Sequence, residues 1–397
     1  MEYGFVKAAA VTPQIRVADT AYNAESTAAA IRRAADAGAR IIVTPELGLT
    51  AYTCADLFAQ PVLLDGAERA LETVLARCAG LDAVYVVGLP VRYGGKLYNC
   101  AAVAHGAALL GVVPKTNLPN YGEFYERRWF TPAPQEPGRV TLAGQEAPFD
   151  ARLLFECGAF CMGVELCEDL WAPCPPSVGL ALAGAQVIVN PSASDETVGK
   201  DDYRRDLVRG QSARLHCAYL YADAGMGESS TDMVFASHNL IAENGALLAE
   251  SALFGDGVAA TELDIERLDF DRRRSNTFPP ARDGGYTQVR FELEPAPAPL
   301  TRFVARTPFI PEDVRDRENR CETILNIQAE GLARRLSHAR CRTAVVGISG
   351  GLDSCLALLV SVRAMEKLGR PASEVTAVTM PCFGTTARTR NNAAILT

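Results

Sequence analysis

Apolar and polar positions along the first 285 residues or so alternate between segments of strand character and segments of helix character. The stretches 4–13 (GFVKAAAVTP), 39–46 (ARIIVTPE) and 185–194 (AQVIVNPSAS) are apolar runs of strand length. The Ala-rich stretch 24–38 predicts a helix instead, and it closes at Gly38, a frequent helix stop. The β-branched run 39–46 is typical of a buried strand, and it ends at Glu46.

Further stretches predict antiparallel strands joined at short turns. These are 83–115, which turns at Gly94–Gly95 and ends at Lys115, 151–167, which turns at Gly158, and 234–251, which turns at Asn244–Gly245. Residues 201–225 predict an amphipathic helix and then a strand. Helices mixed with this many hairpins favour an α/β fold in which helices cover a sandwich of sheets.

The composition changes around 272–312, where Pro, Arg and Gly are frequent, as in a domain boundary. We therefore predict a first domain at 1–275, a linker at 276–312 and a second domain at 313–397. The second domain should contain a long amphipathic helix, then strand, glycine loop, helix and strand. Parallel sheets normally have more strands than these two, so we expect this domain to be incomplete.

Composition and charge narrow the functional classes. The 397 residues are 48% hydrophobic, enough for two cores, and the formal net charge of −8 argues against nucleic acid as a partner. We expect no signal peptide and no membrane span. The 12 cysteines are scattered, several within apolar runs, which fits a reducing cytoplasm. A cytoplasmic enzyme is the default expectation.

Cys167, in VELCEDLWAP, follows a strand and precedes two carboxylates, Glu168 and Asp169. Negative neighbours raise the pKa of a thiol, so a nucleophilic Cys167 needs a base and a positive charge from elsewhere. Glu46 and Lys115 also stand at strand ends, where α/β proteins assemble their sites. Lys115 could supply the charge and Glu46 could accept the proton, with the backbone N–H of Glu168 as a second oxyanion donor.

Two other interpretations of the cysteine region are weaker. Zinc would need a cluster of ligands, but the four nearby cysteines form no Cys-x-x-Cys pair; they are Cys157, Cys161, Cys167 and Cys174. A Cys-His mechanism would need a nearby histidine, but the four in the chain are widely separated and form no pairing motif; they are His105, His216, His238 and His338.

A second motif, VVGISGGLDSCLALLV, places a glycine loop between an apolar strand and an apolar helix. Glycines let backbone N–H groups approach an anion, and the N-terminus of the following helix favours negative charge. Asp353 could hold Mg²⁺ that bridges phosphates. No Lys-Ser/Thr follows, so this is no Walker A loop. The candidate ATP-binding residues are Gly347, Ile348, Ser349, Gly350, Gly351, Leu352, Asp353 and Ser354.

The contexts PELGLTAY, PKTNLPNYGEFYERRWF and GVELCEDLW together closely resemble the nitrilase (carbon–nitrogen hydrolase) superfamily, over roughly residues 3–265. More narrowly, they look like the glutaminase domain of the glutamine-dependent NAD synthetases. The resemblance implies an αββα sandwich with Cys167 as nucleophile, Glu46 as general base and Lys115 as oxyanion stabiliser. No cofactor is implied for this half.

By the same resemblance, four further residues belong to the glutamine site: Tyr121, Glu123, Ser194 and Lys200. Glu123 matches a second glutamate that orients the lysine and the base in nitrilases; otherwise it is an exposed loop acid. Lys200 stands where relatives often carry Arg, so a point charge replaces a two-pronged carboxylate clamp.

The Ser-Gly-Gly-Leu-Asp-Ser loop resembles the PP-loop ATP pyrophosphatases, and the downstream MPCFGTTARTRNNA resembles NAD synthetases. This implies the start of a Rossmann-like domain in which ATP and Mg²⁺ activate nicotinic acid adenine dinucleotide and ammonia from glutamine completes NAD. A homo-oligomer, often an octamer in the family, is also implied.

The chain ends about 45 residues after the loop. We therefore expect a fragment, or a truncated gene product, that retains glutaminase chemistry and cannot make NAD. Two alternatives are a nitrilase-type amidase for another small amide and a non-enzymatic module with an inert cysteine.

Overall fold

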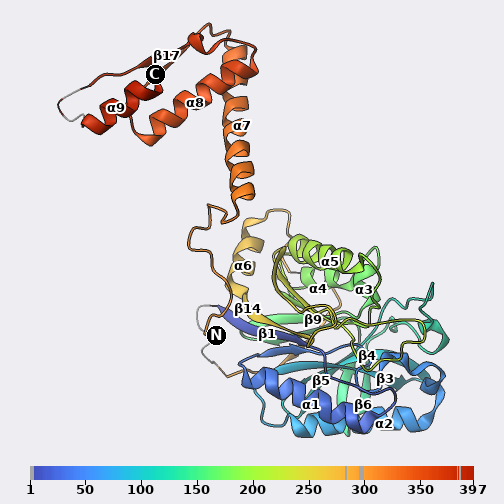
Figure 1. Ribbon diagram of the computed structural model, residues 1–397. Helices are drawn as coiled ribbons and strands as arrows, with labels where there is room; N and C mark the ends of the chain where they lie inside the picture. The colour runs from blue at the N-terminus through green and yellow to red at the C-terminus, as the bar shows by residue number, and fades with distance from the viewer. Residues whose placement is uncertain (1–3, 282–283, 295–298, 382, 384–385) are drawn as a thin grey trace. The chain divides into compact units, whose positions relative to one another are not determined.

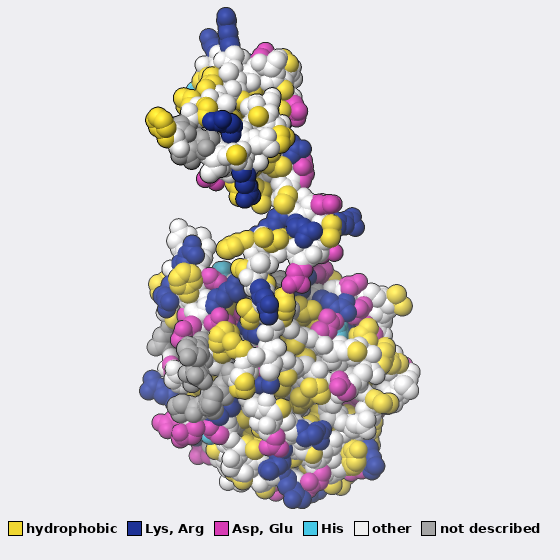
Figure 2. Space-filling view, turned by 60° about the vertical axis from the view of Figure 1, so that its left-hand side comes forward, with side chains coloured by type: hydrophobic (Ala, Val, Ile, Leu, Met, Phe, Trp, Pro, Cys, Tyr) yellow, Lys and Arg dark blue, Asp and Glu magenta, His cyan; other side chains and the backbone are white. Residues whose placement is uncertain are grey.

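The computed structural model describes residues 4–281, 284–294, 299–381, 383 and 386–397. The chain divides into two compact units, Met1–Arg302 and Phe303–Thr397. In Figure 2, side chains of both charge signs are interspersed over the visible face of the first unit. No helix in the described ranges is long and apolar enough to cross a membrane.

The first unit contains an eight-stranded sheet in the order β14-β1-β2-β3-β4-β5-β7-β6. Its strands are β1 (Phe5–Val11), β2 (Ile41–Val43), β3 (Val84–Tyr93), β4 (Lys96–His105), β5 (Ala108–Pro114), β6 (Gly138–Leu142), β7 (Gln145–Phe149) and β14 (Val258–Asp264). The parallel pairs β1–β2 and β2–β3 lie at its centre, and β3, β4 and β5 run antiparallel as predicted.

A seven-stranded sheet faces the first one, in the order β13-β12-β11-β10-β9-β8-β15. Its strands are β8 (Leu153–Cys157), β9 (Phe160–Val164), β10 (Val187–Pro191), β11 (Ala218–Ala222), β12 (Leu240–Glu243), β13 (Ala246–Glu250) and β15 (Thr287–Arg290). β15 pairs in parallel with β8, so the stretch 276–312, which we expected to be only a linker, contributes a strand to this sheet. The predicted domain boundaries stay a prediction.

The alternation of side chains along β1 shows why its sequence is apolar except for Lys7. Val6, Ala8 and Ala10 pack between the two sheets against residues of the seven-stranded sheet, while Ala9 and Val11 pack on the outer face beneath helices. A strand that is buried on both faces needs no polar positions. The predicted turn at Gly94–Gly95 joins β3 to β4, with φ of 54° and 75°, as a two-residue hairpin requires.

Helices cover the outer face of each sheet (Figure 1). The eight-stranded sheet carries α1 (Thr20–Asp36) and α2 (Pro61–Arg77). The seven-stranded sheet carries α3 (Glu168–Trp171), α4 (Pro176–Leu182) and α5 (Lys200–Leu215), and α6 (Ile265–Arg274) follows β14. The unit is thus an αββα sandwich, as the fold prediction stated.

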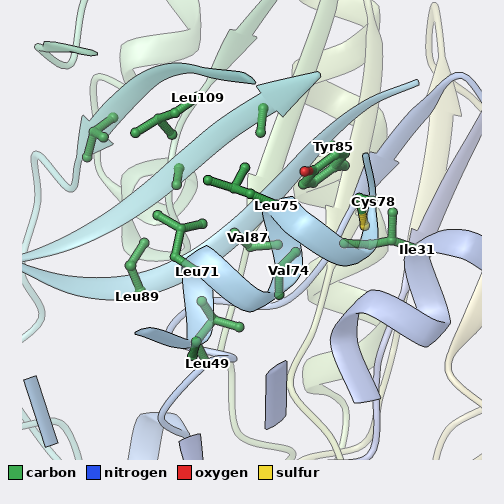
Figure 3. Packing of buried hydrophobic residues seen from close by; sticks show 14 of the residues in the cluster. Ile31, Leu49, Leu71, Val74, Leu75, Cys78, Tyr85, Val87, Leu89 and Leu109 are labelled. Carbon is green, nitrogen blue, oxygen red and sulfur yellow. The ribbon is translucent and has the colours of Figure 1, made fainter. Parts of the chain in front are cut away.

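Figure 3 shows how α2 closes one outer layer: Leu71, Val74 and Leu75 point from the helix toward Tyr85, Val87 and Leu89 of β3. We did not predict this helix from the sequence. Its signals are nevertheless present, because Pro61 starts the helix and apolar residues recur every three or four positions.

The second unit is a smaller α/β arrangement. It contains α7 (Val314–His338), β16 (Ala344–Gly347), α8 (Leu352–Lys367), β17 (Val375–Val378) and α9 (Ala387–Leu396). β16 and β17 pair in parallel, and α7 packs on α8 through Ala333 and Ala364. The predicted order of helix, strand, glycine loop, helix and strand is confirmed.

Candidate active site

Three strand ends in the first unit carry the predicted reactive side chains. Glu46 lies three residues after β2, Lys115 follows β5 directly, and Cys167 lies three residues after β9. The first two strands belong to one sheet and the third to the facing sheet. The backbone N–H of Glu46 donates to the carbonyl of Ser192 after β10, at 3.3 Å, so the two sheets meet at the site.

The Lys115 ammonium is fully buried between two carboxylates. Its Nζ donates to Oε1 of Glu46 and to Oε1 of Glu126, each at 2.6 Å. Burial alone would lower the pKa of Lys115, but the two negative charges raise it well above its usual value. Lys115 is therefore protonated at neutral pH.

Glu126, rather than Glu123, orients the lysine. Glu123 is half-buried on the loop, whereas Glu126 is buried at the start of the short 3-10 helix η2 (Glu126–Arg128), which turns its side chain toward Lys115. Tyr52 donates its hydroxyl to the same carboxylate at 2.9 Å. The contact expected of Glu123 is therefore made by Glu126, three positions further along the chain. The geometry of the loop, and not the spacing in the sequence, decides which acid enters the interior.

Glu46 is held on one oxygen and free on the other. Its Oε1 accepts from Lys115 and, at 2.7 Å, from Asn99 Nδ2, while its buried Oε2 has no hydrogen-bond partner among the described residues. Burial raises the pKa of Glu46 to about 7, and Lys115 opposes that rise. The turn after β2 packs so closely on β3 that a Cβ on Gly88 would lie 2.3 Å from the Leu47 nitrogen.

Cys167 has a strained backbone and a buried thiol. Its φ of 40° is left-handed, which is unfavourable for a residue with a Cβ, and the residue is 4% exposed. Burial, and then the charge of Glu46, raise the pKa of the Cys167 thiol well above its usual value, while Lys115 and a hydrogen bond with Ser192 lower it. The resting residue is therefore a thiol that becomes nucleophilic only as its proton leaves.

The two carboxylates after Cys167 have other partners. Asp169 is buried and accepts the backbone N–H groups of Leu166 and Asn117, at 3.0 and 2.7 Å. Glu168 accepts the Tyr121 hydroxyl at 2.9 Å. Burial is the first cause that raises the pKa of each of these acids. Their side chains organise the loops around the cysteine, which explains how two acids can follow Cys167.

The other predicted glutamine-site residues lie on three separate segments. Lys200 begins α5, where it pairs with Asp195, and its Nζ lies 5.5 Å from the ring centres of both Phe124 and Trp171. Ser194 is buried after β10, and its hydroxyl accepts from Arg204 at 3.4 Å. Tyr121 is exposed apart from its hydroxyl contact with Glu168.

Sequence reasoning missed the polar residues that support the three reactive groups. They are Tyr52, Asn99, Glu126, Asn190 and Ser192. Asn99 lies in strand β4, whose neighbouring positions are mostly apolar. The signal in the sequence is one amide side chain beside alanines and a valine.

In the second unit the glycine loop lies between β16 and α8, as expected. Gly350 has φ 82°, and a Cβ there would lie 1.9 Å from the carbonyl oxygen of Thr389 on α9. The hydroxyls of Ser349 and Ser354 lie 3.1 Å apart. Asp353 is exposed in the first turn of α8, and the Ile348 side chain packs into the core of the unit.

The residues considered for zinc and for a Cys-His site are dispersed. Cys157 lies between the sheets and Cys174 is exposed, and no group of three or more His, Cys, Asp or Glu within the described ranges could hold a metal ion. His238, which is buried, contacts Arg204 and Glu250.

Comparison with known proteins decides the family. Residues 7–273 match the carbon–nitrogen hydrolase family. The chain belongs to the carbon–nitrogen hydrolase family. Residues 324–397 match the NAD synthase family, so two known domain types occur in one chain.

Relatives named glutamine-dependent NAD(+) synthetase align with nearly all of this chain. The glutamine-dependent NAD(+) synthetase of Mycobacterium tuberculosis H37Rv is 42% identical over 99% of this chain and 60% of its own length. That of Thermotoga maritima is 28% identical over 94% of this chain and 60% of its own length. The chain thus spans about three fifths of the length of the curated relatives it matches.

Solved structures agree on the fold. A glutamine-dependent NAD+ synthetase from Acinetobacter baumannii, in complex with ADP, superposes with a TM-score of 0.57 at 24% identity, covering 98% of this chain and 62% of its own. An amidase from Nesterenkonia sp. AN1 superposes with a TM-score of 0.52 at 21% identity, covering 68% of this chain and 99% of its own. The carbon–nitrogen hydrolase sandwich and the α/β second unit are therefore the expected fold.

Proposed function

We propose that the first unit hydrolyses the side-chain amide of glutamine and that the released ammonia serves ATP-dependent conversion of nicotinic acid adenine dinucleotide to NAD. The observation that supports the hydrolysis most directly is the buried Lys115, held at 2.6 Å by both Glu46 and Glu126, with the Cys167 thiol in the field of all three charges. Relatives named glutamine-dependent NAD(+) synthetase support glutamine as the amide donor and NAD as the product.

The first step is attack by sulfur on the amide carbon. Because the resting group is a thiol, its proton must be removed as the bond forms, and Glu46 Oε2 has the free lone pairs to accept it. A base with a pKa of about 7 is half ionised at neutral pH and can both take and return a proton. The S–C bond forms, and the carbonyl electrons move to oxygen.

Two donors suit the developing oxyanion. Lys115 donates two of its three hydrogens to Glu46 and Glu126, which leaves the third for the substrate oxygen. Glu168 is the first residue of α3, so its N–H has no acceptor within the helix. Glu46 then protonates the leaving nitrogen, the C–N bond breaks, and ammonia departs from a thioester. Water, deprotonated by Glu46, hydrolyses the thioester to glutamate and restores the thiol.

Lys200 and Glu168 carry charges that suit the α-carboxylate and the α-ammonium group of an amino acid. Lys200 is restrained by Asp195 and two aromatic rings, and its point charge suits the α-carboxylate of glutamine. Glu168 presents a half-buried carboxylate beside Tyr121, which suits the α-ammonium group. In this proposal Tyr121, Ser194 and Lys200 hold the substrate, and Glu123 lies at the edge of its site.

In the second unit, the glycine loop fits the phosphates of ATP. The loop Ser349–Ser354 is mostly exposed, it holds two hydroxyls, and it opens the N-terminus of α8, where backbone N–H groups favour an anion. Asp353 alone supplies a carboxylate, so Mg²⁺ there would need phosphate oxygens and water as its other ligands. Assembly into a homo-oligomer stays a prediction from the family resemblance.

Ammonia release by the 397-residue chain tests the proposal. Wild type and Cys167→Ala would be compared on glutamine and on propionamide, a small aliphatic amide without charged ends. We expect release from glutamine that disappears in the variant and is much weaker with propionamide. Preference for propionamide would favour a general amidase, and release that survives Cys167→Ala would refute Cys167 as the nucleophile.

A further inference from the structure

The strained backbone of Cys167 is hydrogen-bonded to the side chain of Asn190 on strand β10. Its N–H donates to Asn190 Oδ1 at 2.7 Å and also to the carbonyl of Pro191 at 3.0 Å. The left-handed conformation of Cys167 persists only where surrounding groups impose it, because its Cβ disfavours it. This N–H is therefore occupied and is no oxyanion donor.

A continuous chain of hydrogen bonds runs away from Asn190 into the seven-stranded sheet. Asn190 Nδ2 donates to the Tyr219 hydroxyl at 2.9 Å, and that hydroxyl donates to Glu165 Oε1 at 2.5 Å. The second oxygen of Glu165 accepts the backbone N–H of Ser177, at the start of α4, at 2.7 Å. All these residues are at least 99% buried, and water cannot replace the bonds.

The chemistry of the two ends determines the direction of every bond. A backbone N–H can only donate, so Asn190 must turn its oxygen to Cys167 and its NH₂ to Tyr219. Tyr219 then has one hydrogen left, and Glu165 receives it. Both oxygens of Glu165 accept hydrogen bonds, so the chain ends there, and bonds aligned in one direction strengthen one another.

We propose that Asn190, Tyr219 and Glu165 are positioning residues that hold Cys167 in its left-handed conformation, so that Sγ stays beside Ser192 and in the field of Lys115 and Glu46. The inference rests on the proposed function only in taking Cys167 as the nucleophile. None of the three residues contacts the substrate in this scheme, and their effect passes through the Cys167 backbone.

The decisive variant is Tyr219→Phe, with Tyr85→Phe as its matched control. Both tyrosines are fully buried, and both hydroxyls donate a hydrogen bond, that of Tyr85 to the carbonyl of Gly106 at 2.6 Å. Only Tyr219 connects to Cys167. We expect Tyr219→Phe to lower kcat for ammonia release about 10-fold or more while KM for glutamine changes less than about 3-fold, and Tyr85→Phe to leave both near wild type.

Alkylation of Cys167 by iodoacetamide, followed by mass spectrometry of its peptide, gives a second readout that needs no glutamine. We expect its rate to fall about 10-fold in Tyr219→Phe and not in Tyr85→Phe. Equal alkylation rates in the two variants would overturn the positioning role. If the wild type releases no ammonia, the proposed function fails, while the alkylation comparison still decides this inference.

A second pair of variants covers the case in which Tyr219→Phe does not fold. Asn190→Asp retains an oxygen for the Cys167 N–H, whereas Asn190→Leu removes the acceptor and keeps the branching of the side chain. We expect the alkylation rate of Asn190→Asp to exceed that of Asn190→Leu. The reverse order, or no difference, would contradict a role for the Asn190 oxygen in holding Cys167.

Discussion

Asp169 accepts the backbone N–H of Asn117 at 2.7 Å, and this single carboxylate ties the loop after Lys115 to the helix after Cys167. Its second oxygen accepts the N–H of Leu166 at 3.0 Å. Lys115 and Cys167 are thus spaced by Asp169, a residue whose negative charge we first expected to disfavour a thiolate.

Asp169→Asn should separate these loops. An amide NH₂ would face backbone N–H donors, and a buried donor left without an acceptor costs about 1–3 kcal/mol. We expect a lower melting temperature and roughly 10-fold slower ammonia release. The control is Asp206→Asn, an exposed position on α5. Equal behaviour of the two variants in thermal unfolding and in the ammonia assay would contradict the role of this bond.

Glu126→Gln and Glu123→Gln form a second matched comparison. Loss of the Glu126 charge removes one of two carboxylates on a buried ammonium, so we expect a roughly 100-fold loss of kcat/KM. Glu123 is half-buried on the loop, and its substitution should change kcat/KM less than about 3-fold. A larger loss at Glu123 than at Glu126, measured by ammonia release, would restore the assignment based on sequence spacing.

The pH dependence of kcat/KM should follow Glu46. The base must be ionised, and burial raises its pKa to about 7, so the rate should rise about 10-fold per pH unit below pH 7 and level off above it. Lys115 does not titrate in this range, because the pKa of its ammonium is raised. A profile that is flat from pH 5 to 8, in assays of the full chain, would exclude Glu46 as the base.

The stability of the first unit should fall between about pH 4.5 and pH 7. Burial raises the pKa of Glu165 from 4.5 to about 7, so in this window the folded state binds more protons than the unfolded state, and the free energy of unfolding decreases as pH rises. Glu165→Gln removes this titration and should flatten the decline by about 1–3 kcal/mol. Thermal unfolding of the wild type and of Glu165→Gln at pH 5.0 and 7.5 measures this difference in pH dependence. Identical pH dependence in the two proteins would count against a buried, ionising Glu165.

Gly350→Ala should disrupt the glycine loop, whereas Gly347→Ala should not. A Cβ on Gly350 would meet the carbonyl oxygen of Thr389 at 1.9 Å, while a Cβ on Gly347 meets nothing within 4 Å. We expect Gly350→Ala to lose binding of Mg-ATP, followed by calorimetry, and to sensitise α8 and α9 to proteolysis. Intact binding in Gly350→Ala would show that the loop tolerates rearrangement.

Local sequence signals were sufficient wherever a structure is decided by near neighbours. Gly94–Gly95 and Asn244–Gly245 predict their hairpins because those turns require positive φ. The long helix α7 and the loop before α8 follow from periodicity and from a short motif. The strand ends near Glu46, Lys115 and Cys167 could be recognised for the same reason, since each of these residues follows an apolar run within three positions.

Contacts between residues far apart in the sequence decided the features that local signals did not predict. No spacing rule indicates that Glu126 rather than Glu123 enters the interior, because a short 3-10 turn sets the direction of each side chain. β15 lies in a Pro- and Arg-rich stretch, and only its pairing with β8 makes it a strand. The backbone N–H of Cys167 donates to the side chain of Asn190, 23 positions away, and to the carbonyl of Pro191.

The sequence by itself determined most of the elements, the strand ends that carry Glu46, Lys115 and Cys167, and the glycine loop, because periodicity, turn chemistry and short motifs act over a few residues. Only the tertiary structure decided which buried polar groups meet. Asn99, Glu126 and Tyr52 come from separate segments, and each becomes part of the site only when packing removes water and leaves the others as its partners.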